Sequence, residues 1–132
     1  MLARLLTLLW CFGGTMALAP GRTVGIDLGT TNSAIAILRD GGVPEMVKNR
    51  RGQLTTPSAV AFLEGGEVLV GEDALEQSSS NVYNTVLAAK RFIGRPLKSM
   101  SSDARAAGCE VVADGSGQCL FNLPALPQPI AP

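Results

Sequence analysis

Apolar residues alternate with glycine and aspartate from Val24 to Gly29. A period of two is typical of a β-strand, because successive side chains then point to opposite faces of a sheet. A turn at 29–32 leads into a second predicted strand at 33–38. Asp40-Gly41-Gly42 has the composition of a hairpin turn, so residues 44–48 are expected to return as a third strand.

Short apolar runs separated by turn residues continue along the rest of the chain. Four further strands are expected in two antiparallel pairs, at 59–63 with 68–70 and at 110–113 with 118–122. Short helices are expected at 72–77 and 86–93, and Gly94 would end the second as a left-handed cap. Proline is frequent in the last ten residues, which excludes a central strand there. The pattern predicts an α+β fold, a β-meander with short helices.

The first nineteen residues have the pattern of a secretory signal peptide. Arg4 provides a positive charge, residues 5–12 are almost wholly apolar, and small residues occupy 17–19 before a cleavage site. The sequence therefore predicts a signal peptide at 1–19 and one domain at 20–132. No stable membrane anchor is expected, because Gly13 and Gly14 interrupt the run well short of about 20 apolar residues. The alternative is meaningless upstream sequence added by a wrongly assigned start codon.

Charge and composition narrow the classes of function. Eleven basic and eleven acidic residues cancel, and no basic run suggests a nucleic-acid partner. The sequence has no histidine, which removes the commonest general base and metal ligand. Its three cysteines lack the paired spacings of a zinc site. Chemistry must therefore depend on carboxylates, hydroxyls, lysine and backbone amides.

The first predicted hairpin carries the most informative chemistry. Asp27 shares one face of its strand with Gly25 and Gly29, so a large group could approach the backbone beside the carboxylate. The turn then offers consecutive N–H groups and the hydroxyls of Thr30 and Thr31, a cluster of donors that suits phosphate. A Mg²⁺ ion would relieve the repulsion between Asp27 and the phosphate. The alternative is an ordinary hairpin that tolerates an aspartate.

A second candidate group lies at 90–95, Lys-Arg-Phe-Ile-Gly-Arg. Lys90 follows three apolar residues, so its stem could be buried and its ammonium aimed inward. A positioned lysine would stabilise the negative charge that develops on a transferred phosphoryl group. The alternative is a basic pair on a solvated surface.

These stretches are similar to known families. Residues 25–32 resemble the first phosphate motif of the actin and sugar-kinase ATPase superfamily. Residues 55–62 (Thr-Thr-Pro-Ser-Ala-Val-Ala-Phe), 70–72 and 84–95 resemble the 70-kDa heat-shock chaperones specifically. The likeness runs in register from 23 to 95, and it implies an incomplete actin-like (ribonuclease H-like) ATPase lobe, of mixed α+β or α/β class.

The resemblance also implies cofactors and site residues. ATP or ADP with Mg²⁺ would be bound, and Asp27 would hold the metal through water. The β- and γ-phosphates would be lined by Gly29, Thr30, Thr31 and Asn32. Lys90 would help to place the γ-phosphate and the attacking water, the one catalytic role that the resemblance gives. Asn32-Ser33 resembles the bacterial and organellar branch of the family.

Several of the family's parts have no counterpart in the sequence. These are its second phosphate motif, catalytic glutamate, adenosine motif and peptide-binding domain, so clients and co-chaperones would be bound only through parts not found here. The four residues 114–117, Asp-Gly-Ser-Gly, are interpreted as a hairpin turn and not as the second motif. The expected function is a nucleotide-binding fragment of an ATP-dependent folding chaperone, not catalytically competent alone. The alternatives are a fragment of a carbohydrate kinase or a non-catalytic interaction protein.

A signal peptide and an ATP requirement together suggest the endoplasmic reticulum lumen, or a plastid reached through it. Cys109 and Cys119 lie symmetrically about Asp114, so a hairpin centred there would place them opposite one another. In an oxidising lumen they could form a disulfide. The alternative is two reduced cysteines that flank a turn.

Overall fold

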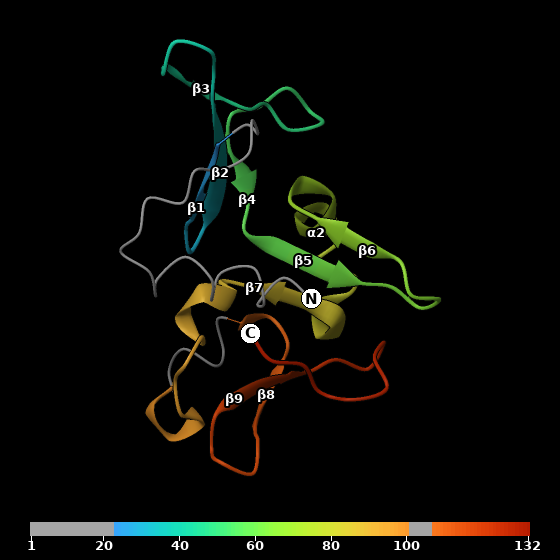
Figure 1. Ribbon diagram of the computed structural model, residues 1–132. Helices are drawn as coiled ribbons and strands as arrows, with labels where there is room; N and C mark the ends of the chain where they lie inside the picture. The colour runs from blue at the N-terminus through green and yellow to red at the C-terminus, as the bar shows by residue number, and fades with distance from the viewer. Residues whose placement is uncertain (1–22, 101–106) are drawn as a thin grey trace.

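The computed structural model describes residues 23–100 and 107–132, so the predicted signal peptide lies outside the described residues. The first sheet contains β1 (Val24–Leu28), β2 (Asn32–Leu38), β3 (Pro44–Met46) and β4 (Thr56–Pro57). β1 pairs antiparallel with one edge of β2, and β3 and β4 pair with its other edge. The first hairpin follows the alternation in the sequence, whereas β3 is shorter than the predicted 44–48 (Figure 1).

The second sheet has the order β6-β5-β7, formed by β6 (Val68–Val70), β5 (Ala59–Phe62) and β7 (Thr85–Leu87). The predicted β5–β6 pair is confirmed. The predicted helix at 86–93 is wrong, because this stretch forms β7 and then the 3₁₀ helix η2 (Ala89–Arg91). A short apolar run fits either structure. The β-branched Thr85 and Val86 favour the strand, and pairing with β5 buries both of them.

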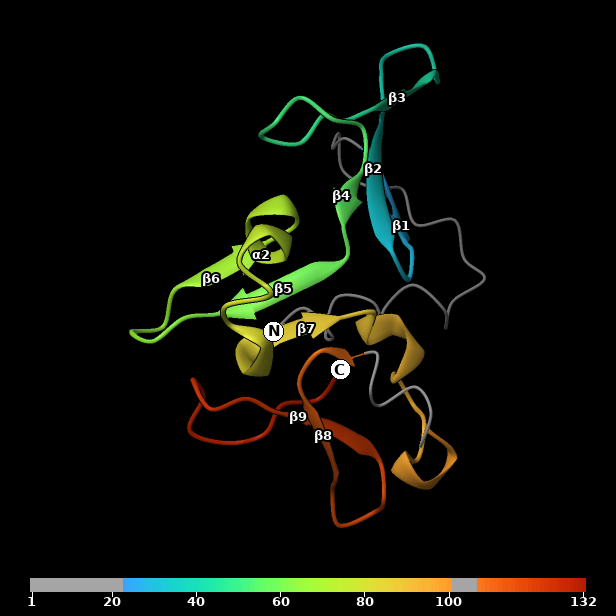
Figure 2. The same ribbon diagram turned by 180° about the vertical axis from the view of Figure 1, so that it is seen from behind.

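Helix α2 (Glu72–Glu76) confirms the helix predicted at 72–77. Its buried residue Ala74 packs against Ala59 and Ala61 of β5, and Figure 2 shows the helix lying against the β5–β6 pair. Two further 3₁₀ turns, η1 (Val82–Asn84) and η3 (Leu97–Ser99), connect the later elements. No helix in the described parts of the chain is long and apolar enough to cross a membrane.

The third group of strands is the predicted hairpin of β8 (Glu110–Ala113) and β9 (Cys119–Asn122). Its turn holds Asp114, whose carboxylate accepts hydrogen bonds from the N–H groups of Ser116 and Gln118, at 2.8 and 2.9 Å. Hydrogen bonds from both the hydroxyl of Ser116 and these N–H groups hold the pKa of Asp114 below its ordinary value.

The expected pairing of Cys109 with Cys119 is wrong. Cys119 lies opposite Ala113, because the loop between the paired strands has five residues and its centre is Ser116, not Asp114. Both thiols are free and buried, and desolvation raises the pKa of Cys109 to about 11.

The larger core lies between this hairpin and the β7–η2 segment (Figure 1). Phe92 of the segment after η2 meets Phe121 of β9 edge to face, with ring centroids 5.4 Å apart. The eight buried residues of this core are Val86, Phe92, Met100, Ala107, Cys109, Cys119, Phe121 and Leu123. Phe92 therefore anchors the chain that carries Lys90.

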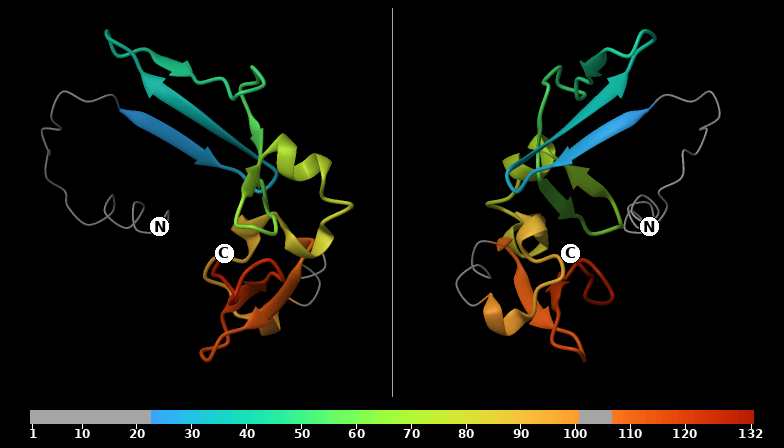
Figure 3. Two further views of the ribbon diagram at one scale, coloured as in Figure 1. Left: turned by 90° about the vertical axis from the view of Figure 1, so that its right-hand side faces the viewer. Right: turned by 60° about the vertical axis from the view of Figure 1, so that its left-hand side comes forward.

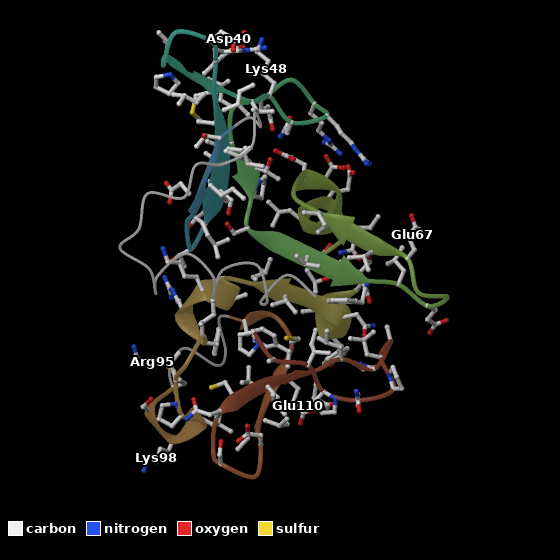
Figure 4. All side chains as sticks on the ribbon, in the orientation of Figure 1. Asp40, Lys48, Glu67, Arg95, Lys98 and Glu110 are labelled. Carbon is white, nitrogen blue, oxygen red and sulfur yellow. The ribbon has the colours of Figure 1, made fainter. Side chains whose placement is uncertain are left out.

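Ion pairs lie outside this core and fasten loops to their neighbours. Arg39, directly after β2, pairs with Glu45 of β3 across the β2–β3 hairpin, with a 2.5 Å contact. Arg51, in the loop before β4, pairs with Asp73 and Glu76 of α2 and lowers the pKa of Glu76. Other charged side chains, among them Asp40, Glu67 and Lys98, extend outward from separate parts of the molecule (Figure 4).

Candidate functional site

The turn between β1 and β2 lies at the inner end of its hairpin, where β4 meets β5 (Figure 3). Gly29 is the first residue of the turn, and its backbone lies close to that of Asn32 at the other end of the turn. A Cβ atom on Gly29 would lie 2.1 Å from the carbonyl oxygen of Asn32, a distance that no side chain tolerates. Glycine is therefore required here by close backbone approach, which the sequence pattern alone did not show.

The turn presents unpaired donors. Within residues 23–100 and 107–132, the backbone N–H groups of Thr30 and Thr31 donate to no backbone acceptor. Thr31 and Asn32 are exposed and Thr30 is half-buried. Two N–H groups and two hydroxyls within one turn provide the donor cluster that an anion such as phosphate requires.

Asp27 lies on an open face of the hairpin made of small residues. It pairs with Ala34 across the strands, and Gly25 pairs with Ala36. Asp27 is exposed, and a Cβ atom on Gly25 would meet nothing within 4 Å. An open hollow of about 390 Å³ adjoins these residues. The carboxylate therefore has room for a hydrated ion beside it.

This arrangement fits a metal held through water better than one held directly. Among the described residues, no cluster of three or more cysteine, aspartate or glutamate side chains could hold a metal ion. Mg²⁺ commonly retains several waters and takes one or two carboxylates together with phosphate oxygens. Asp27, one carboxylate that precedes the donor-rich turn by two residues, suits that pattern.

Lys90 lies in η2 and is exposed, so the expected burial of its stem is not found. The structure nevertheless brings its neighbourhood to the turn. A cavity of about 220 Å³ is lined by Thr30, Thr31 and Asn32 together with Leu87 and Ala88. Ala88 precedes Lys90 by two residues and has a left-handed backbone, φ 52° and ψ 35°.

Ser58 is the residue that sequence reasoning missed. It connects β4 to β5, is half-buried, and lines the same cavity as the turn. Its hydroxyl donates to the carbonyl of Gly29 at 2.8 Å, and its N–H donates to the carbonyl of Thr31 at 2.8 Å. In the sequence, the stretch 55–62 is informative only through its family likeness. A serine 29 residues from its partner leaves no pattern in a sequence.

Comparisons with known proteins show which proteins the chain is similar to. A family model described as "Hsp70 protein" matches residues 23–130. The chain is 40% identical over 114 residues to the stromal 70 kDa heat shock-related protein, chloroplastic, of Pisum sativum. It is 45% identical over 112 residues to chaperone protein dnaK3 of Thermosynechococcus vestitus. These matches cover 86% and 85% of this chain but 16% of each relative.

A third relative, chaperone protein dnaK of Cyanidioschyzon merolae, is 47% identical over 96 residues, which cover 73% of this chain and 16% of the relative. The chain therefore spans about a sixth of the length of these curated relatives. The matched family region includes the β1–β2 turn, Ser58 and η2.

Proposed function

Because the chain belongs to the Hsp70 family, we propose that it binds the Mg²⁺–phosphate end of ATP or ADP in an ATP-dependent folding chaperone. The observation that carries the proposal is the β1–β2 turn, whose unpaired N–H groups and threonine hydroxyls follow an exposed aspartate. A carbohydrate kinase is not supported, since the family model and the named relatives are those of heat-shock chaperones.

The proposal gives each site residue a role. Asp27 holds hydrated Mg²⁺, which would neutralise phosphate charge when bound. The β- and γ-phosphates lie against Gly29, Thr30, Thr31 and Asn32. Lys90 supports the γ-phosphate and its attacking water beside the 220 Å³ cavity, whose lining includes Leu87 and Ala88. Its exposed side chain is free to extend toward a bound nucleotide.

We further propose that the chain alone binds nucleotide weakly and does not turn it over. Phosphoryl transfer depends on positioning groups on all sides of the nucleotide. The sequence offers no second phosphate motif, catalytic glutamate or adenosine motif. Unfolded clients and co-chaperones would be contacted through other parts of a full-length family member.

Calorimetric titration of the 132-residue chain with ATP tests the proposal. Binding should require Mg²⁺, and the Asp27→Asn variant should lose that requirement together with most of the affinity. Asp40→Asn, which changes an exposed aspartate in the β2–β3 turn, is the matched control and should bind like the unmodified chain. Equal affinity with and without Mg²⁺ would contradict the role of Asp27. Steady phosphate release that Asp27→Asn abolishes would contradict the lack of turnover.

The non-catalytic interaction protein remains a second candidate because of one observation. The apolar face of β1 and β2 is exposed, with Ile26 at 69% and Val24 at 52% of their full accessibility. Exposed apolar faces of this kind often bind other protein surfaces. This function predicts no Mg²⁺-dependent nucleotide binding, so the same titration decides between the two.

The relatives also bear on the compartment. The relative from Pisum sativum is named as chloroplastic, and we propose a plastid location, with residues 1–19 directing entry through the secretory pathway. A fluorescent protein fused after residue 40 should then accumulate in plastids, and deleting residues 1–19 should leave it in the cytosol. Plastid import of the truncated fusion would contradict the secretory route.

A further inference from the structure

We infer that Ser58 is a positioning residue that aims the N–H groups of Thr30 and Asn32 at the phosphates of the nucleotide. The inference rests on the proposed function, but its geometric part stands on contacts within the chain. Ser58 lies where the chain leaves β4 in the first sheet and enters β5 in the second. It therefore ties the β1–β2 turn to the centre of the molecule.

Three hydrogen bonds place Ser58 against the turn. Its hydroxyl donates to the carbonyl of Gly29 at 2.8 Å, and its N–H donates to the carbonyl of Thr31 at 2.8 Å. The hydroxyl of Ser33 lies 2.8 Å from that of Ser58. Since the single hydroxyl proton of Ser58 is directed at Gly29, Ser33 is the donor in this third contact. The side chain and the N–H group of Ser58 thus hold the carbonyls of Gly29 and Thr31, which lie two residues apart in the turn.

The held carbonyls fix the direction of two N–H groups. In a trans peptide unit, the carbonyl of one residue and the N–H of the next point in opposite directions. The carbonyls of Gly29 and Thr31 both point toward Ser58. The N–H groups of Thr30 and Asn32 therefore both point away from it, toward the same side. Donors that lie together on one side of a turn can contribute to a site that binds anions.

A clamp is needed because Gly29 cannot fix its own conformation. Glycine has no Cβ atom and populates a wide range of backbone angles, yet the approach of Asn32 forbids any larger residue at this position. The 29–30 peptide unit is therefore free to rotate unless its carbonyl is held from outside. Ser58 supplies that hold, and an alanine in its place would leave the carbonyl of Gly29 without its donor.

The orientation is tested without any ligand. Residual dipolar couplings of the ¹⁵N-labelled chain report the directions of the N–H vectors of Thr30 and Asn32. The two vectors should lie on the same side of the turn in the unmodified chain. In Ser58→Ala, rotation of the 29–30 peptide unit should reduce the coupling of Thr30, while the couplings of β8 and β9 stay unchanged. Vectors on opposite sides in the unmodified chain would overturn the inference, even if Ser58→Ala does not fold.

The functional part is tested by calorimetric titration with pyrophosphate in the presence of Mg²⁺. Ser58→Ala should weaken binding about tenfold, as expected for the loss of one hydrogen bond that aligns a donor. Ser58→Thr keeps the hydroxyl and should restore most of the affinity. Ser99→Ala is the matched control, because the hydroxyl of Ser99 likewise donates to a backbone carbonyl, that of Pro96, at 2.8 Å; this variant should bind normally.

The outcomes separate this inference from the proposed function. Failure of the unmodified chain to bind pyrophosphate would contradict the proposed function, while the dipolar couplings would still decide the role of Ser58. Normal binding by Ser58→Ala would overturn the inference and leave the proposed function intact. A urea-unfolding midpoint that falls equally in Ser58→Ala and Ser58→Thr, with equal losses of affinity, would show a general structural role and also overturn it.

Discussion

At the scale of single residues, the two glycines beside Asp27 have different reasons to be glycine. Gly25 and Gly29 lie two residues to either side of Asp27 and share its face of the hairpin. A Cβ atom on Gly25 would meet open space, whereas one on Gly29 would collide with the backbone of Asn32. Gly25 therefore leaves room for a ligand, and Gly29 allows the turn itself to close.

This difference gives a matched pair of variants. Gly29→Ala forces the backbone of the turn to move, so it should weaken Mg²⁺–nucleotide binding by about tenfold or more and cost about 1–3 kcal/mol of stability. Gly25→Ala should change the free energy of unfolding by less than about 1 kcal/mol. Calorimetric titration and urea unfolding measure both effects. Equal losses of stability in the two variants would mean that the close approach at Gly29 has no role.

A second prediction at the residue scale concerns the contribution of Lys90 to ATP turnover. In a full-length relative that carries this segment in place of its own, Lys90→Ala should lower ATP turnover by about 10²-fold, because a lysine acting on developing charge contributes mainly in the transition state. Nucleotide affinity should change little. Lys98→Ala, which removes another exposed lysine in η3, is the control. Unchanged turnover in Lys90→Ala would show that Lys90 is a solvated surface residue without a role in hydrolysis.

At the scale of elements, the β8–β9 hairpin depends on the turn that Asp114 organises. Hydrogen bonds lower the pKa of its carboxyl group in the folded chain. Such a group stabilises the fold above its pKa in the unfolded chain, which is about 3.9, and this contribution is lost as the pH falls through the lower folded value.

Asp114→Asn should therefore be less stable than the unmodified chain at pH 7, and the difference should shrink as the pH falls below about 3.9 and through the lower folded pKa of Asp114. Thermal unfolding followed by circular dichroism from pH 7 to pH 2.5 measures this, with Asp40→Asn as the control for losing a turn carboxylate. A stability difference that stays constant across this range would show that the hydrogen-bonded charge of Asp114 does not contribute.

The elements also show what the sequence could and could not predict. Alternation and a glycine turn were sufficient for β1 and β2, since these signals are local. The strand β7 was missed because the apolar run 86–89 fits a helix or a strand, and only pairing with β5 decides between them. The left-handed backbone of Ala88, which ends that strand, is unusual for a non-glycine residue and has no sequence signal.

The candidate site likewise contains residues that the sequence could predict and one residue that it could not. Asp27 and residues 29–32 could be proposed from spacing, because strand periodicity places them on one face and in one turn. Ser58 could not, because its contacts with Gly29 and Thr31 join separate elements across the fold. The disulfide pairing failed for a related reason, because the register of β8 and β9 depends on the loop length that the hydrogen bonds of Asp114 select.

At the scale of the whole molecule, the described residues bury their larger core in the half that contains β7 and the β8–β9 hairpin. The β1–β2 hairpin, which carries the candidate site, has no buried residue on either strand. The chain also spans only 16% of the relatives named above. A phosphate site on so open an element should bind weakly, since few surrounding groups exclude water from it.

An amide NMR titration of the 132-residue chain with Mg²⁺–ADP tests the central claim most directly, because it reports binding at each backbone N–H group. We expect saturable shifts at Thr30, Thr31 and Asn32 that require Mg²⁺ and vanish in Asp27→Asn, with little change in β8 and β9. Unchanged turn amides at millimolar nucleotide, or shifts that are the same without Mg²⁺, would contradict the claim that this turn is a Mg²⁺–phosphate site.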